Sequence, residues 1–415
     1  MKRSPTLVLT IAGLAYFLAV TQRSSLGVAT LTASERFDTN AQQLATLAVF
    51  QLVVYAAMQI PVGILLDRFG AKLLLGVGAA IMASGQIIVA FAPTLEYAVL
   101  GRMLVGMGDS FTFISMIRMV NGWYSGSKAS KMQQYVSTIG QTGQFFSAVP
   151  FWFMLETLGW EPAFSIMAAA SLLVLLLVIA LTANEPEASK HVQQVVSLKA
   201  AINQLVENVR SPGIRMAFWT HFSTQPTTTS ISLLWAVPYL VTAEGQSHEF
   251  AALTLTLMVL FGFVTGPIIA EVCARAPQLR GTLVYSIVGS TVAAWLVLLL
   301  VPGKASSVLL LACFLVISVG GPASMVAFDF SKDFAPKQRL GSANGFANVG
   351  GFLATFIMMY LTGLVIDLLH DPSSGLDRYN VDSFRWGFAA QFIVIAVGLV
   401  FFTLERRKTL RITSL

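Results

Sequence analysis

Three charged residues, Arg23, Arg102 and Asp109, lie inside long apolar stretches of the sequence. A charge inside a membrane costs several kcal/mol unless it finds a partner or lines a water-filled cavity. Asp109 follows Arg102 by seven residues, about two helical turns or ~10 Å along nearly the same face, so we expect the two to share a polar network. Arg23 lies about two-thirds of the way along its apolar run, where a fixed cation favours an anionic ligand.

Uncharged polar side chains recur at helical spacing in other apolar stretches. Each set places hydrogen-bond donors on one face of a helix, and such donors suit the recognition of carboxylates or hydroxyls. The same amides can instead hold neighbouring helices together without touching any ligand. The candidates are Gln51, Tyr55 and Gln59 in one stretch, Gln141 and Gln144 in a second, and Asn344 and Asn348 in a third.

A polar run from Thr220 to Ser230 interrupts one apolar stretch, and Pro226 lies near its middle. Proline removes a backbone donor, and lipid does not tolerate a polar break, so we expect a broken helix that lines a cavity and presents Gln225. His221 is the only histidine inside a predicted membrane span. Because imidazole ordinarily titrates near neutrality, His221 is a candidate proton site, and a neutral hydrogen-bonding group is the alternative.

Composition excludes several classes of protein. Of the 415 residues, 55% are hydrophobic and 11% are charged, against about 25% charged in a soluble domain, so a water-soluble enzyme is excluded. The sequence contains no hydrolase triad, phosphate-binding glycine loop or metal-ligand cluster, and its two cysteines predict neither a disulfide nor a metal site. We therefore expect no catalytic residues, cofactor or metal. We expect no nucleic-acid partner, because the basic residues lie at the ends of apolar stretches rather than on one continuous face.

The polar residues must be positioned by helices that cross a membrane. A hydrocarbon core of roughly 30 Å needs about 20 apolar residues, and stretches of this length repeat along the chain. The predicted fold is an all-α membrane protein with twelve transmembrane helices. The predicted spans are 6–31, 44–66, 73–92, 95–117, 132–155, 164–183, 214–242, 249–270, 281–301, 307–328, 341–368 and 384–404.

The distribution of basic residues predicts the orientation of these spans. With the N-terminus cytoplasmic, 20 of the 26 Lys and Arg residues fall on the inside and 4 on the outside, which places both termini in the cytoplasm. The longest polar joint divides six spans from six. We expect an N-terminal bundle at 1–183, a cytoplasmic loop at 184–212, a C-terminal bundle at 213–404 and a cytoplasmic tail at 405–415.

A short charged joint begins at the end of the second span. It contains Gly63, where helices can approach closely, and Asp67, Arg68, Gly70 and Lys72. This joint resembles the signature loop of the major facilitator superfamily of transporters, and the twelve spans and central joint match that family over the whole chain. The resemblance implies that these five residues form a gating loop that latches one half of the protein to the other. The alternative is a short basic turn that only follows the orientation rule.

A second motif, Arg102-x-x-x-Gly106-x-Gly108, also resembles the family. The resemblance implies that Arg102, with Asp109, takes part in proton coupling, and a static structural ion pair is the alternative. Residues Tyr16 to Thr32 resemble the anion:cation symporter branch, whose members carry organic carboxylates. That branch has an aspartate just before the arginine, and this chain has Gln22 before Arg23.

We therefore expect a multi-pass protein of the inner (plasma) membrane that moves a small organic anion by alternating access. The expected partners are an anionic small molecule, a proton or other cation and the lipid bilayer, and the family resemblance implies a monomer. Arg23 is the expected anchor, with Gln22, Tyr16, Gln225 and the amide and tyrosine sets as substrate-binding residues. Two alternatives are a proton-driven exporter of amphipathic compounds and a membrane sensor that transports nothing.

Overall fold

The computed structural model describes residues 4–124, 132, 135, 136, 139–184, 203, 206–336, 340–370 and 379–413. The side chains of some residues inside these ranges, Asp67 and Arg68 among them, lie outside the description. Within the described ranges every regular element is a helix. Among the described residues, ten helices are long and apolar enough to cross a membrane, so the all-helical membrane fold is confirmed, whereas the count of twelve stays a prediction.

By its internal contacts the chain divides into two compact units, Met1–Thr32 with Phe50–Leu198, and Ala33–Val49 with Lys199–Leu415. The boundaries predicted for the bundles, the central loop and the tail stay predictions, and most of the central loop lies outside the described residues.

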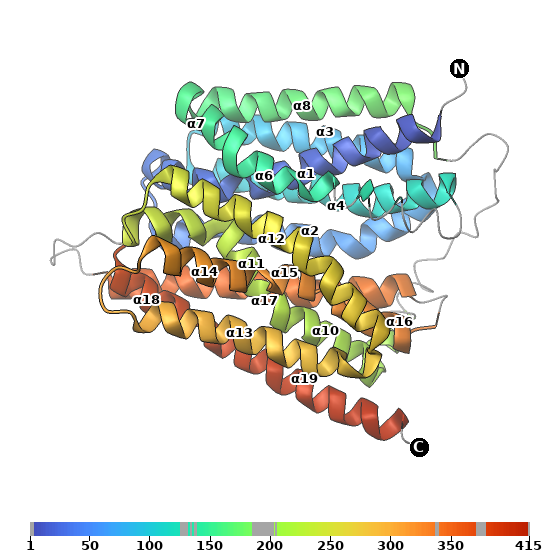
Figure 1. The fold of residues 1–415 in the computed structure, drawn as a ribbon. Helices are drawn as coiled ribbons and strands as arrows, with labels where there is room; N and C mark the ends of the chain where they lie inside the picture. Colours follow the sequence, from blue (N-terminus) through green and yellow to red (C-terminus); the bar gives the residue numbers. More distant parts are fainter. Residues whose placement is uncertain are drawn as a thin grey trace. The chain divides into compact units, whose positions relative to one another are not determined.

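The first unit contains most of α1 (Pro5–Phe37) and α2 (Ala41–Phe69), because the residues from Ala33 to Val49 belong to the second unit. Its other helices are α3 (Ala71–Ala90), α4 (Leu95–Trp123), α6 (Gly143–Phe146), the π-helix η1 (Ser147–Phe151), α7 (Trp152–Leu158) and α8 (Trp160–Leu181). Helix α3 packs against α4 and α8 (Figure 1). Helix α1 continues to Phe37, beyond the predicted end at residue 31, because hydropathy marks only the apolar part of a helix whose polar end extends further.

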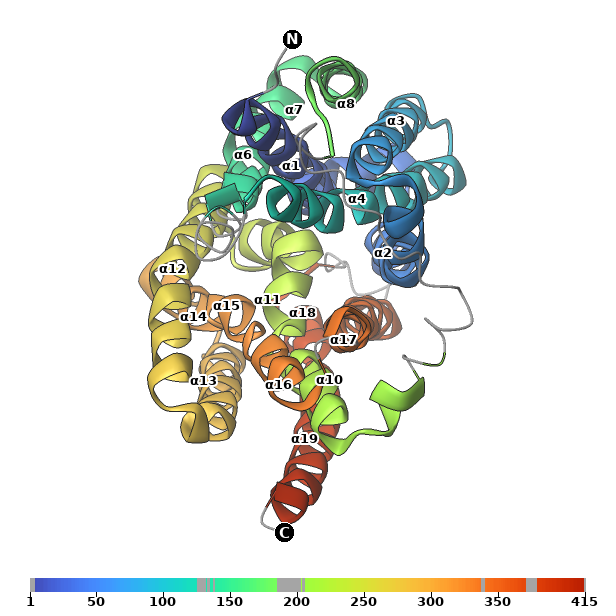
Figure 2. The same ribbon diagram turned by 90° about the vertical axis from the view of Figure 1, so that its right-hand side faces the viewer.

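The second unit contains more broken helices. Its elements are α10 (Pro212–Thr224), α11 (Pro226–Ser230), η3 (Ile231–Trp235), η4 (Pro238–Ala243), α12 (His248–Arg275), η5 (Pro277–Leu279), α13 (Arg280–Leu300), α14 (Ser307–Ser318), α15 (Gly320–Ala323), α16 (Val326–Phe334), α17 (Leu340–Leu369), α18 (Val381–Ala389) and α19 (Gln391–Thr413). Helix α10 packs against α16, α17 and α19 (Figure 2). The apolar core of the second unit includes Met216, Phe222, Val284, Phe330, Met358 and Phe402.

The break expected at Pro226 is present. Helix α10 ends at Thr224, and α11 begins at Pro226 and continues into the π-helix η3. Proline cannot donate to the preceding turn, and π-type turns widen a helix locally, often at functional sites. The predicted span 214–242 is therefore a series of short helical pieces rather than one rod.

Candidate functional site

A buried ion pair joins α1 to α4 in the first unit. Arg23 Nε lies 2.6 Å from Asp109 Oδ2, and Arg23 Nη2 lies 2.9 Å from Asp109 Oδ1. The side chain of Asp109 is 1% exposed and that of Arg23 is 16% exposed. This two-bond fork is the geometry with which a guanidinium binds any carboxylate. The group predicted to anchor an anion therefore already holds a carboxylate of the chain itself.

Arg102 joins the same network, and among the described residues it binds no acid directly. Its Nη1 donates to the carbonyl of Gln22 at 3.1 Å and to Ser25 Oγ at 3.3 Å, and its Nη2 donates to the carbonyl of Arg23 at 3.1 Å and to Gln51 Oε1. All four acceptors are uncharged, and Arg102 is 1% exposed. With Arg23 and Asp109 charged, the three side chains carry a net charge of +1. Arg102 is thus the source of a positive potential beside the ion pair.

Gly106, four residues after Arg102, lets α4 approach α2 closely enough for Arg102 to bind Gln51. A Cβ atom on Gly106 would lie 2.2 Å from the backbone oxygen of Gln51, far inside van der Waals contact. The close approach places Gln51 within reach of Arg102. The motif glycine therefore has a packing role that supports the charged cluster.

The other polar residues predicted in the first unit lie around this cluster in different ways. The guanidinium carbon of Arg23 is 4.9 Å from the ring centre of Tyr55, within range of a cation–π contact. Gln141 Nε2 donates to the hydroxyl of Tyr16 at 2.8 Å, and Gln144 Nε2 donates to Gln141 Oε1 at 2.7 Å. Gln59 Nε2 donates to the carbonyl of Tyr55 at 3.3 Å.

Gln22 points to another helix. Its amide nitrogen donates to the carbonyl of Met167 at 3.0 Å and to Ser171 Oγ at 2.6 Å, both on α8, and its side chain is completely buried. This amide holds α1 against α8 in the way that polar groups join membrane helices.

The second unit holds an uncharged polar site around the break at Pro226. His221 is 1% exposed, and its Nδ1 has no hydrogen-bond partner among the described residues. A Cβ atom on Gly351 would lie 1.9 Å from His221 Nδ1 and 2.6 Å from Gln225 Oε1, so α17 passes directly over both side chains. Asn344 and Asn348 lie on the same helix α17, and Asn344 Oδ1 is also buried without a described partner.

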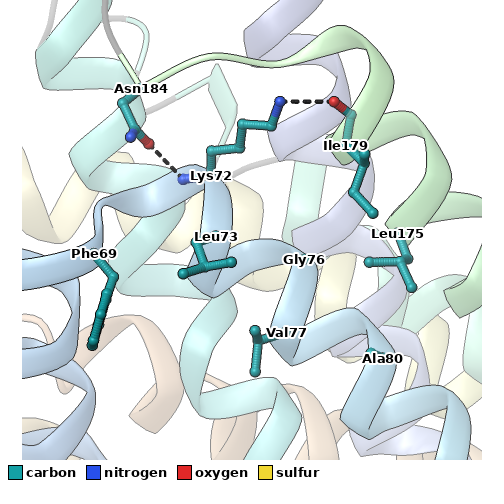
Figure 3. Close-up of a pocket in the computed structure, with 9 residues that line it drawn as sticks. All are labelled: Phe69, Lys72, Leu73, Gly76, Val77, Ala80, Leu175, Ile179 and Asn184. Carbon is teal, nitrogen blue, oxygen red and sulfur yellow. Dashed lines mark hydrogen bonds between the residues drawn. The ribbon is translucent and has the colours of Figure 1, made fainter.

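The predicted gating loop begins within α2, which runs on to Phe69. Gly63 faces open space, Gly70 has a positive φ of 78°, and the side chains of Asp67 and Arg68 lie outside the described residues. The backbone N–H of Lys72 donates to Asn184 Oδ1 at 2.6 Å, and Lys72 Nζ donates to the carbonyl of Ile179 at 2.7 Å (Figure 3). The start of α3 is thus tied to the end of α8, and the gating role stays a prediction.

Two residues outside the predicted site also tie helix ends together. Asn184 binds the start of α3, and Asp367 binds the start of α2 through the backbone N–H groups of Ala41 and Gln42. In the sequence each is an ordinary polar residue at the edge of an apolar stretch. Side chains that cap a distant helix leave no local spacing signal.

The fold and the apolar helices define an integral membrane protein, and comparison with known proteins gives its family. The model of the Major Facilitator Superfamily matches residues 12–330 and 226–414, so the chain belongs to this superfamily. Its family and fold are those of transporters, not of enzymes.

The chain is similar to several curated transporters. It is 25% identical over 276 residues to a probable L-galactonate transporter of Escherichia coli K12, covering 63% of this chain and 60% of that protein. It is 26% identical to the probable sulfoacetate transporter SauU of Cupriavidus necator, over 40% of this chain and 39% of that protein. The chain thus spans less than two thirds of either relative. It is 25% identical to the probable galactarate/D-glucarate transporter GarP of E. coli K12, over 78% of this chain and 79% of that protein.

A solved structure shares the fold. The crystal structure of a bacterial homologue of the human lysosomal transporter Spinster superposes with a TM-score of 0.74 at 16% identity and covers 98% of each chain.

Proposed function

We propose that the protein is a secondary active transporter that imports a small carboxylate-type anion together with a proton. It works by alternating access, as a monomer with twelve spans in the inner membrane and both termini in the cytoplasm. The observation that carries the proposal is the forked pair of Arg23 with Asp109, because a carboxylate of the protein occupies the place that a substrate carboxylate would take. The relatives, which are probable transporters of L-galactonate, sulfoacetate and galactarate/D-glucarate, support this class of substrate.

Competition for Arg23 couples the proton to the anion. While Asp109 is charged it holds both donors of the Arg23 fork. A proton on Asp109 removes its charge and weakens both bonds, which frees the guanidinium for the substrate carboxylate. Loss of substrate then lets Asp109 release the proton and bind Arg23 again. The anion and the proton therefore bind and leave together.

The neighbouring residues support this exchange. Arg102 keeps the cluster positive and fixes the backbone of Arg23 through its carbonyl. Tyr55 stacks on the guanidinium and holds it when Asp109 lets go. We assign hydroxyl recognition to the polar residues of both units, namely Tyr16, Gln51, Gln59, Gln141, Gln144, Gln225, His221, Asn344 and Asn348. Gln22 serves helix packing, and residues Gly63 to Lys72 act in gating.

Uptake by purified protein in liposomes tests the proposal. The substrates are radiolabelled galactarate, L-galactonate and sulfoacetate, driven by an inward proton gradient. We expect Asp109→Asn to exchange substrate across the membrane but not to accumulate it against a gradient, and Arg23→Gln to lose binding and transport. Arg275→Gln is the matched control, because Arg275 is 79% exposed and pairs only with its helical neighbour Glu271 among the described residues. Parent-like transport by Arg23→Gln would overturn the anchor assignment.

A further inference from the structure

An apolar trough lies between α3 and α8 in the first unit (Figure 3). Its volume is about 400 Å³. On α3 the trough is lined by Gly76 and Ala80, which are one turn apart and have small side chains. The facing wall is formed by Leu175 and Ile179, which are one turn apart on α8. Leu73 and Val77 on α3 are 52% and 38% exposed, so the trough opens at the surface of the unit.

One end of the trough is polar and the rest is apolar. Lys72 and Asn184 line that end, and their hydrogen bonds fix both side chains there. A cation at the end of an apolar channel is complementary to a phospholipid, whose anionic phosphate lies above its acyl chains. From Lys72 to Ala80 helix α3 rises ~12 Å, close to the ~15 Å of hydrocarbon in one leaflet.

We propose that this trough binds one acyl chain of an anionic phospholipid, with its headgroup phosphate at Lys72. The bound lipid covers Leu73 and Val77 and reinforces the contact between the start of α3 and the end of α8. Lys72, at the end of the predicted gating loop, takes part in this contact between α3 and α8. The bound lipid therefore stabilises the loop independently of the cluster around Arg23.

Native mass spectrometry of the purified full chain, released from nanodiscs of equal phosphatidylglycerol and phosphatidylcholine, tests this site. The parent is expected to retain one phosphatidylglycerol about fivefold more often than phosphatidylcholine, the effect of one lysine at an anionic surface. Lys72→Gln should retain either lipid equally, and Ala80→Phe, which fills the trough, should retain neither. Lys332→Gln, at an exposed lysine outside the trough, is the charge control and should match the parent.

Two results would overturn the proposal. One is unchanged lipid retention in both Lys72→Gln and Ala80→Phe, with each variant folded by circular dichroism. The other is protection against heating by glycerol phosphate equal to that by phosphatidylglycerol, which would make the site one for phosphate alone. Because neither readout uses transport, the result is independent of the proposed substrate.

Discussion

The cluster around Arg23 in the first unit and the polar site around Pro226 in the second unit differ in charge. In the first unit Arg23, Arg102 and Asp109 form one network with a net positive charge. In the second unit the polar residues around Pro226 are neutral, and several of their buried atoms, including His221 Nδ1 and Gln391 Nε2, have no partner among the described residues. A charge needs fixed partners inside a membrane, whereas a neutral donor can wait for a ligand or water. The site around Arg23 is thus built to hold a charge, and the site around Pro226 to adapt to uncharged groups.

The two sites should differ most in the free energy of unfolding that is lost when one polar pair in each is broken. Asp109→Leu leaves Arg23 and Arg102 without an acid and should lower the free energy of unfolding by about 3–5 kcal/mol. Thr227→Val removes a neutral bond to Gln391 Oε1, 3.3 Å long, and should cost about 1 kcal/mol. Thermal unfolding in detergent measures both. The double variant Arg23→Met/Asp109→Leu should recover part of the loss, and equal losses in the two units would contradict the comparison.

Close helix packing should matter in both units, with a smaller effect. Ala at Gly106 meets the backbone of Gln51, and Ala at Gly351 meets His221, so each substitution should cost about 1–3 kcal/mol. Gly289→Ala and Gly345→Ala are matched controls, because nothing lies within 4 Å of a Cβ there and Ala favours a helix. The measurement is again thermal unfolding. Equal stability of Gly351→Ala and Gly345→Ala would show that His221 can move away from α17, so that the close packing at Gly351 does not contribute to stability.

The charged cluster should also make substrate binding depend on pH. Because anion binding requires a proton on Asp109 in our proposal, the Kd should rise about tenfold for each pH unit above the point at which Asp109 loses that proton in the free protein. In Asp109→Asn the Kd should be independent of pH. Scintillation proximity binding with a labelled sugar acid between pH 5 and 9 measures the slope. A flat profile in the parent would rule out coupling through Asp109.

The sequence alone predicts which residues are buried and charged, but not how they pair. Hydropathy and basic-residue counts indicate the membrane helices, and Pro226 indicates the broken one. Spacing along one helix predicts that Arg102 and Asp109 share a polar network, but it does not reveal that the acid binds Arg23 on another helix. Gln22 is adjacent to Arg23 in sequence but faces α8. Pairing between helices depends on their rotation and separation, which residues such as Gly106 set and no local pattern records.

Substitution of His221 should have the smallest effect on the pH dependence of substrate binding. This measurement tests most directly whether the charged site and the uncharged site have different roles. A buried imidazole with no acid bound to it among the described residues has no counter-charge for a proton, so it should stay neutral through the transport cycle. His221→Gln keeps a donor and an acceptor and should change the pH slope of binding by less than about twofold. Its effect should appear instead in selectivity between sugar acids that differ at a hydroxyl, measured by competition in the same binding assay. If His221→Gln flattened the pH profile as Asp109→Asn does, proton coupling would extend into the second unit, and its polar site would carry charge after all.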